Sequence, residues 1–401
     1  MIASPKAAPS QSRSTALIFP YKHLLARYCH ATLATPQRKA GLVSSRFFGV
    51  GCIVPKVEEF KDPADWIEKV KAAFDAVPSV QKFKAVNVDD LNFHWAGDGY
   101  VEPEGQETQI PSSGMLTFEV NIPTRLQKYM LLANDEVEIF RVTILFHYVH
   151  PVTYIECLGA PGEVTHPSWA LVVVREFLRE ELKKRDLSVG LLVIGPSPFH
   201  ADFSLRNGTG PQPAGDGFSV EVEKSLAYDR ITYFHESADS LRALYSSLQL
   251  QFSYFYRFTI LRNMRLRAAV DLSDQSEEIA ESFKGRGFRA YISRTLAVRQ
   301  KLQSAQLDAV SARLTTTRHK RGSAEDLEGL YPGEEAAHLR GYLEKSMKED
   351  YIEEIESAEK ILDVLDGRHS QELQRFATIT FSLLGVAFGA LLTAAFRSWW
   401  G

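Results

Sequence analysis

ATITFSLLGVAFGALLTAAF, residues 377–396, is the stretch around which this chain is organised. It has no charged residue, and nine of its twenty residues are Leu, Ile, Val or Phe. A helix of this length spans about 30 Å, which matches the hydrocarbon core of a bilayer. Arg375 and Arg397 flank the stretch, and Trp399 and Trp400 follow it as an interfacial aromatic anchor. The sequence therefore predicts a single C-terminal transmembrane anchor within residues 369–401.

Basic residues are more frequent just before this stretch than after it. Lys360, Arg368 and Arg375 precede it, and Arg397 follows it. By the positive-inside rule, the large N-terminal part is expected in the cytoplasm. A bacterial inner membrane is the favoured location, and a mitochondrial membrane is the alternative.

One face of the predicted membrane helix carries small and hydroxyl-bearing residues: Thr378, Ser382, Gly385, Gly389 and Thr393. Gly385 and Gly389 form a GxxxG pair, and small residues let helix backbones approach closely. The face predicts self-association of the helix and hence a homo-oligomer in the lipid bilayer. A pore lining built from several copies is the alternative.

Composition excludes several function classes. The net charge is −4, so no nucleic-acid partner is expected. Three cysteines at wide spacing argue against a disulfide framework. The chain has no CxxC pair, which argues against a structural zinc site. The chain has no GxxxxGK[ST], HExxH or GxSxG motif. We therefore predict no enzyme activity, no cofactor and no metal, and leave an unknown protein partner open.

Residues 1–57 contain eight Lys or Arg and no Asp or Glu. Such a composition is typical of a transit peptide, and equally of a disordered basic tail or a wrongly assigned start. This stretch is expected to lie outside the fold.

Residues 58–236 predict an α+β head domain. Asp62 and Pro63 form the start signal of a first helix, and 168–185 carries a second helical pattern. Strand patterns occupy 115–122, 137–149, 154–158 and 189–194, and 218–222 with 230–234 predicts an antiparallel pair.

Residues 237–368 predict a helical stalk. Helices are expected at about 237–270, at 277–317 and from about 334, with a loop containing Gly322, Pro332 and Gly333. The second helix is basic and the last is acidic, which predicts an antiparallel hairpin. Apolar residues of the last helix repeat at coiled-coil spacing: Tyr351, Ile355, Ala358, Leu362 and Leu365. A general helical bundle is the alternative to a coiled coil.

The weak candidate for a polar site is His200 with Asp202, two residues apart after a buried strand. Side chains at that spacing in a strand share a face, so the pair could serve as an acid–base or metal pair.

This layout resembles the CorA-type divalent-cation transporter superfamily. The corresponding parts are 58–236, 237–366 and 369–396, with the small-residue face in the place of a pore lining. The resemblance implies a cytoplasmic α/β head and a stalk helix that continues into the membrane. The family's Gly-Met-Asn signature and second membrane helix have no counterpart, so no family residue is transferred.

The sequence favours a membrane-anchored oligomeric sensor or effector, whose soluble head is coupled through the stalk to a self-associating membrane helix. A CorA-like channel subunit and a membrane-tethered enzyme using His200 and Asp202 are the alternatives.

Overall fold

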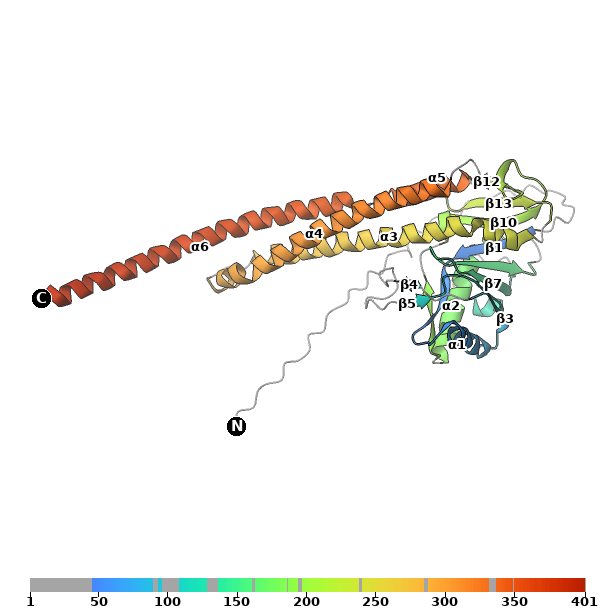
Figure 1. Ribbon diagram of the computed structural model, residues 1–401, viewed down its shortest axis with the longest axis horizontal. Helices are drawn as coiled ribbons and strands as arrows, with labels where there is room; N and C mark the ends of the chain where they lie inside the picture. The colour runs from blue at the N-terminus through green and yellow to red at the C-terminus, as the bar shows by residue number, and fades with distance from the viewer. Residues whose placement is uncertain are drawn as a thin grey trace, which may run out of the picture. The chain divides into compact units, whose positions relative to one another are not determined.

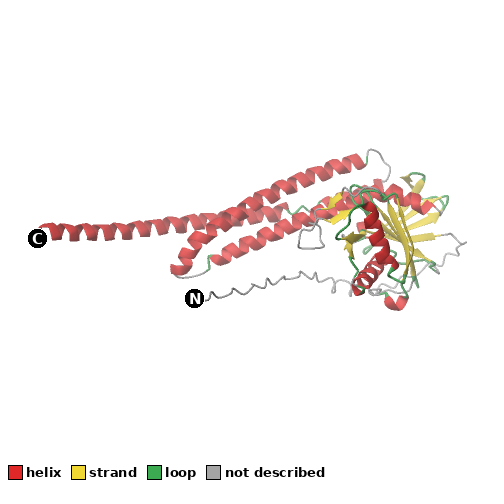
Figure 2. Cartoon of the chain, turned by 60° about the horizontal axis from the view of Figure 1, so that its bottom comes forward, coloured by secondary structure: helices red, strands yellow, loops and turns green. Residues whose placement is uncertain are grey.

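A computed structural model describes residues 45–88, 93–95, 108–127, 136–160, 163–185, 187–193, 197–237, 240–284, 288–331, 337–348 and 350–400. The described chain divides into a sheet domain, made of β1–β13 with α1 and α2, and a set of long helices that follows it (Figures 1 and 2).

The main sheet has nine strands in the order β11-β12-β13-β10-β1-β8-β7-β6-β3. Their bounds are β11 (Gln212–Gly215), β12 (Phe218–Glu223), β13 (Asp229–His235), β10 (Ala201–Asn207), β1 (Ser45–Gly51), β8 (Val152–Leu158), β7 (Ile139–Leu145), β6 (Met115–Asn121) and β3 (Val80–Val86). Neighbours are antiparallel except β10 and β13, which are parallel. Two small pairs accompany the sheet, β2 (Ile53–Val57) with β9 (Val189–Val193) and β4 (Phe93–Trp95) with β5 (Thr108–Ile110).

Helices α1 (Pro63–Asp75) and α2 (Trp169–Lys184) pack on one face of the sheet. Asp62 caps α1 by accepting a hydrogen bond from the Asp65 amide, and Pro63 occupies the first turn, as the sequence predicted. The approach of α2 to β1 is close, because a Cβ on Gly49 would lie 2.7 Å from the carbonyl oxygen of Pro167. Glycine at this position therefore lets the helix lie directly on the strand.

The first part of α3 (Leu241–Ser282) packs on the opposite face, over β1, β8 and β10, through aromatic side chains. Tyr245 stacks on Tyr154 with ring centroids 3.9 Å apart, and its edge meets Phe48 at 5.2 Å. The Tyr154 hydroxyl donates to the backbone oxygen of Tyr245 at 3.0 Å. These contacts attach α3 to the middle of the sheet.

Helices α3, α4 (Phe288–Leu330) and α6 (Ile352–Trp400) pack together as a bundle, and the short α5 (Ala337–Met347) packs against α3. The bundle has its own apolar cluster, to which α6 contributes Ile355, Ala358, Leu362 and Leu365. Arg313 pairs with Glu359 at 3.0 Å and Lys320 with Asp350 at 2.7 Å. These pairs confirm that the basic α4 lies against the acidic segment that follows it, but the predicted last helix is divided into α5 and α6, with Asp350 between them.

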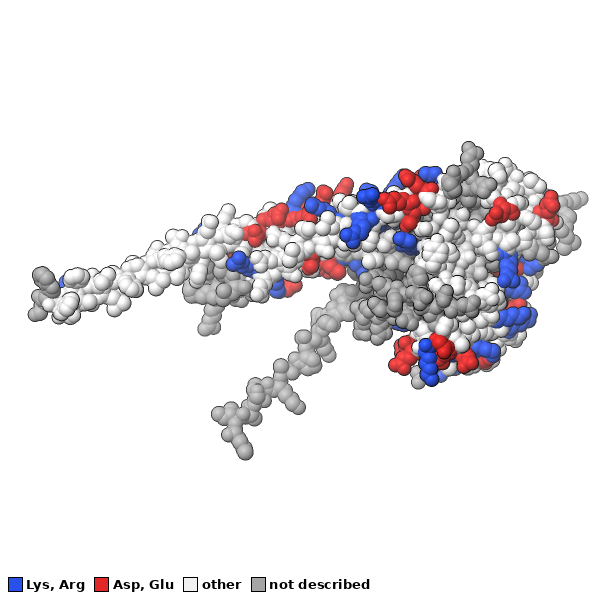
Figure 3. Space-filling view, viewed as in Figure 1, with Lys and Arg blue, Asp and Glu red and all other residues white. Residues whose placement is uncertain are grey.

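The C-terminal half of α6 is apolar and exposed. Within the described chain this is the one helix long and apolar enough to cross a membrane, with a mean hydropathy of 2.0 and no buried residue in its most apolar window. Figure 3 shows this end of α6 as an almost charge-free surface, whereas both positive and negative side chains are visible on the described bundle and sheet domain in the same view. The predicted C-terminal helix is thus present, and it is long and apolar enough to cross a membrane.

The prediction that residues 1–57 lie outside the fold is wrong for its last part. Residues 45–57 form β1 and β2, and β1 is a central strand whose Phe48 and Val50 are fully buried. The interpretation of this stretch relied on its lack of acidic residues. Strand formation depends instead on its short apolar run, in which Phe47, Phe48 and Val50 are all buried. The part before residue 45 lies outside the described residues.

Helix boundaries also differ from the prediction. α3 continues to Ser282, and α4 continues through Gly322 to Leu330. Nothing lies within 4 Å of the position a Cβ would take on Gly322, so this glycine has no packing role. A single glycine in a long packed helix costs only about 1 kcal/mol, and tertiary contacts outweigh it.

Candidate functional site

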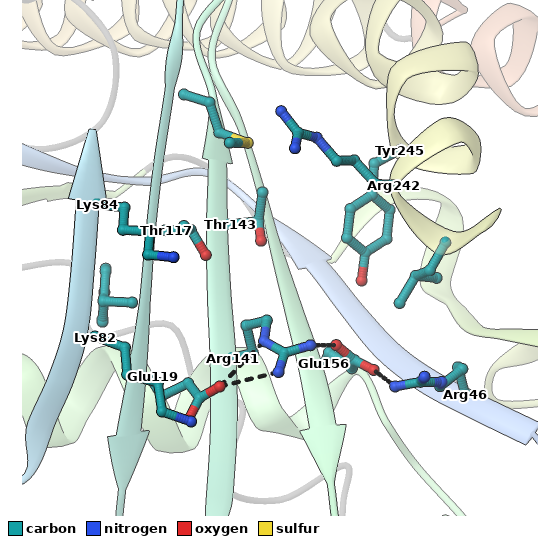
Figure 4. A pocket seen from close by; sticks show the side chains of 13 residues that line it. Arg46, Lys82, Lys84, Thr117, Glu119, Arg141, Thr143, Glu156, Arg242 and Tyr245 are labelled. Carbon is teal, nitrogen blue, oxygen red and sulfur yellow. Dashed lines mark hydrogen bonds and ion pairs between the residues drawn. The ribbon is translucent and has the colours of Figure 1, made fainter. Parts of the chain in front are cut away.

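A pocket of about 520 Å³ lies on the half of the sheet that α3 leaves uncovered (Figure 4). Five neighbouring strands, β1, β8, β7, β6 and β3, form its floor, and the first turns of α3 form one wall. Its lining side chains are Arg46, Lys82, Lys84, Met115, Thr117, Phe118, Glu119, Arg141, Thr143, Glu156, Leu241, Arg242 and Tyr245.

The two-residue period of the strands produces this polar floor. In β6, Leu116, Phe118 and Val120 are buried, whereas the alternate residues Thr117 and Glu119 are only partly buried and line the pocket. In β7, Arg141 and Thr143 line the pocket on either side of the buried Val142; Arg141 is partly buried, and Thr143 is itself buried. The same strands therefore serve the core on one face and the pocket on the other.

Charged residues form an ion-pair row across the floor, defined by Lys82, Glu119, Arg141, Glu156 and Arg46. Glu156 accepts from Arg46 Nη1 at 2.8 Å and from Arg141 Nη1 at 3.0 Å. Glu119 accepts from Arg141 Nη2 at 2.9 Å and pairs with Lys82 at 2.7 Å. The strand register places Glu119 opposite Arg141 and Arg141 opposite Glu156. Opposite charges on facing positions stabilise the sheet.

Burial and ion pairing act together in this row and shift the pKa values of Glu119 and Arg141. The Glu156 side chain is only 4% exposed, and its two guanidinium partners offset the cost of burying a carboxylate. Partial burial by itself would raise the pKa of Glu119, but the hydrogen bonds from Lys82 and Arg141 outweigh it and lower that pKa. Burial would lower the pKa of Arg141, and its carboxylate partners raise it instead. Both shifts favour the charged forms of Glu119 and Arg141.

A second line of side chains, the hydroxyl row, runs beside the ion-pair row. The register sets Lys84 opposite Thr117 and Thr117 opposite Thr143. Arg242 and Tyr245 come to the pocket from α3 (Figure 4). Tyr245 is 4% exposed, and its hydroxyl has no hydrogen-bond partner among the residues that the structure describes.

The pocket has an excess of positive charge. Five cationic side chains and two carboxylates line it, an excess of three positive charges. Both carboxylates are engaged in the ion-pair row, so the arrangement can attract an anion rather than a cation. Over the described ranges, no group of three or more His, Cys, Asp or Glu could hold a metal ion.

The predicted pair of His200 and Asp202 is not formed. Asp202 accepts from His166 Nδ1 and from the Ser168 amide, both at 3.0 Å, and from the Ser168 hydroxyl at 2.5 Å. It thereby satisfies donors at the start of α2. His200 is exposed, ends the short turn η3 (Pro198–His200) and lies beside the ring of Tyr228. Because His200 precedes β10 with a φ of 48°, the alternation that placed both side chains on one face does not apply.

The predicted small-residue face lies on the exposed C-terminal part of α6. Its members Thr378, Ser382, Gly385, Gly389 and Thr393 are all exposed. Thr378 donates to the backbone oxygen of Gln374 at 2.9 Å, and Thr393 donates to that of Gly389 at 2.7 Å. These hydroxyls are satisfied within their own helix and need no polar partner. Whether the face mediates self-association stays a prediction.

Sequence reasoning missed the pocket for an identifiable reason. It used the apolar half of the alternation in 115–122 to predict a strand and did not follow the polar half, Thr117 and Glu119. It also placed Arg46 in the tail and did not identify β3, which carries Lys82 and Lys84.

Comparisons with the models of protein families, with curated proteins and with solved structures found no match to this chain.

Proposed function

We propose that the protein is a membrane-anchored, self-associating sensor or effector. Its sheet domain lies in the cytoplasm and binds a ligand or partner. The bundle acts as a stalk between this domain and the apolar span, residues 377–396.

The continuity of α6 is the observation that carries this proposal. The helix runs without a break from Ile352 to Trp400. Ile355 and Leu362 are fully buried in the bundle, whereas Val386 and Phe388 are 73% and 67% exposed. An exposed apolar stretch of this length is unfavourable in water and favourable in a bilayer. A rotation or shift of the stalk would reach the membrane through one rigid element.

α3 supports a link between the ligand-binding part and the anchor. Its first turns line the pocket through Arg242 and Tyr245. At its other end Ile279 belongs to the same apolar cluster as Leu362, and Arg368 of α6 lies over the ring of Phe283 at 5.2 Å. A displacement of α3 at the pocket would therefore act on α6 just before the apolar span.

Self-association has support outside the span as well. Leu307, Val310 and Leu314 on α4 are 71%, 46% and 63% exposed and lie at helical spacing on the outside of the bundle. The GxxxG face of the anchor predicts contact between copies of the chain, so a second copy is the proposed occupant of this stripe. The channel and enzyme alternatives lack such support, because the hydroxyls of Thr378 and Thr393 bond to their own helix and Asp202 is engaged at α2.

Alkaline extraction of membranes from expressing cells tests the anchor. We expect the full chain in the membrane pellet. Two charges in the span, Val386→Arg with Phe388→Arg, should move it to the soluble or degraded fraction, because each Arg costs about 3 kcal/mol near the helix centre. The matched control, Val364→Arg with Ile361→Arg, changes two exposed apolar residues of the same helix before the span and should leave the protein in the pellet.

Unmodified protein in the soluble fraction would contradict the proposed function. Protease treatment of inside-out vesicles tests the orientation: the sheet domain should be degraded there, and its protection would contradict a cytoplasmic location.

A further inference from the structure

We propose that the pocket is a binding site for a small soluble anion with a phosphoryl group, held by Lys84, Arg242 and the hydroxyls of Thr117 and Thr143. The inference rests on the proposed function only in taking the sheet domain as the ligand-binding part.

The charge balance of the pocket is the first argument. Glu119 and Glu156 are each bonded to two cations of the ion-pair row. Lys84 and Arg242 also line the pocket, and neither has an ion-pair partner among the described residues. They come from different sides of the pocket, Lys84 from β3 in the floor and Arg242 from the wall formed by α3 (Figure 4). An anion between them would be attracted from two sides.

The donors between these cations fit a phosphoryl group. Thr117 and Thr143 face each other in the register, beside Lys84. A phosphoryl group has three terminal oxygens that accept hydrogen bonds from ammonium, guanidinium and hydroxyl donors at once, whereas a carboxylate has two.

Two features of α3 add to the site. The Tyr245 hydroxyl is buried at the pocket wall without a partner within the described chain, and a buried hydroxyl in that state is costly. A ligand oxygen, or a water that the ligand holds, would satisfy it. Leu241 and Arg242 of the first turn also line the pocket, so the positive end of a 42-residue helix lies at its edge.

The volume and lining indicate a ligand larger than inorganic phosphate. The pocket of about 520 Å³ lies within the usual size range for small organic ligands. Met115 and Leu241 add apolar surface to the lining. An organic body attached to the phosphoryl group would occupy this part.

The length of α3 argues for a soluble ligand rather than a lipid headgroup of the anchoring membrane. The pocket lies at Leu241, and Arg368, which precedes the span, lies over Phe283 just after the end of α3. The 42 residues of the helix span about 63 Å. A headgroup in the membrane that holds the span does not reach across this distance.

Calorimetric titration of the full-length protein in neutral-lipid nanodiscs tests the site, with phenyl phosphate as the probe and benzoate as a carboxylate of similar size. We expect phenyl phosphate to bind with a Kd that rises with salt. Lys84→Gln and Arg242→Gln should each raise this Kd about tenfold, the loss expected for one charge-assisted hydrogen bond. Tyr245→Phe should raise it a few-fold.

Lys183→Gln on α2 and Arg299→Gln on α4 are the matched controls, because both remove an exposed cation away from the pocket. Their Kd should equal that of the unmodified protein. Circular dichroism melting curves should show that all variants fold, since Lys84 and Arg242 are exposed.

Absence of phenyl phosphate binding up to about 1 mM, or a folded Lys84→Gln, Arg242→Gln double variant with unchanged Kd, would overturn the site. Benzoate binding as tight as phenyl phosphate would overturn the phosphoryl assignment. The same titration in nanodiscs that contain phosphatidic acid tests a lipid headgroup as the ligand. The affinity for phenyl phosphate should not change. A weaker affinity, caused by competition from the lipid phosphate, would overturn the proposal that the ligand is soluble. Membrane extraction is measured separately, so a protein that is anchored but does not bind refutes this inference and leaves the anchor intact.

Discussion

The carboxylate of Glu156 lies between two guanidinium groups and is almost completely buried. Glu156→Gln would leave Arg46 and Arg141 with a weaker acceptor, and we expect the free energy of unfolding to fall by about 1.5–3 kcal/mol. Glu163 is the matched control, because its side chain is 57% exposed and pairs with Arg206 at 3.0 Å. Glu163→Gln should cost less than about 1 kcal/mol. Urea unfolding followed by tryptophan fluorescence measures both.

Equal losses for the two glutamate variants would mean that burial does not strengthen the ion-pair row. The five strands under the pocket would then be stabilised only by the apolar packing on their other face.

Glu119 predicts a pH dependence of stability. Its pKa in the folded chain is lowered by Lys82 and Arg141, which outweigh the effect of burial, so the folded state binds the proton less readily than the unfolded chain. The stabilisation is complete above the unfolded value of about 4.3 and is lost as the pH falls through the lowered folded pKa.

We therefore expect the stability difference between the unmodified protein and Glu119→Gln to be constant near pH 7 and to shrink below about pH 4.3. Thermal melting as a function of pH measures this difference. A difference that stays the same through the acid range would show that the Glu119 carboxylate contributes nothing as a charge.

At the scale of elements, the contact of α2 with β1 depends on glycine. Gly49→Ala would place a Cβ 2.7 Å from the Pro167 carbonyl oxygen, a backbone atom that moves only with the start of α2. We expect a loss of about 1–3 kcal/mol in unfolding free energy, typical of overpacking. Gly190→Ala on β9 is the control, because nothing lies within 4 Å of the added Cβ, and it should be neutral or slightly stabilising.

Denaturation midpoints of the two glycine variants decide the matter. If Gly49→Ala is as stable as Gly190→Ala, the start of α2 can move away from β1 without cost. The close contact between Gly49 and Pro167 would then not be needed for α2 to pack on β1.

At the scale of the whole molecule, the anchor predicts the assembly. Gly389→Leu would fill the small-residue face and should lower the subunit number of the protein in detergent, because backbones could no longer approach. Ala387→Leu adds a comparable volume on the opposite side of the helix and should leave the subunit number unchanged. Native mass spectrometry measures both variants against the unmodified protein.

An unmodified protein that is monomeric in native mass spectrometry would remove the self-association part of the proposed function. The anchor and the anion site would be unaffected, because neither needs a second copy.

The sequence by itself determined those features that depend on local pattern. The apolar span at 377–396, the start of α1 at Asp62 and Pro63, and the charge difference between α4 and α6 are each written in neighbouring residues. Capping, hydrophobic length and helical period act over a few turns, so they can be identified without knowing the fold.

Only the tertiary structure decided where the candidate site lies. Arg46 and Glu156 are 110 residues apart in the chain, and they meet because β1 is paired with β8. Strand order and register are long-range properties, and no local period encodes them. The same holds for Asp202, whose partners lie on the segment that opens α2 rather than beside it in sequence. The pocket therefore arises from side chains that become neighbours only when the sheet forms.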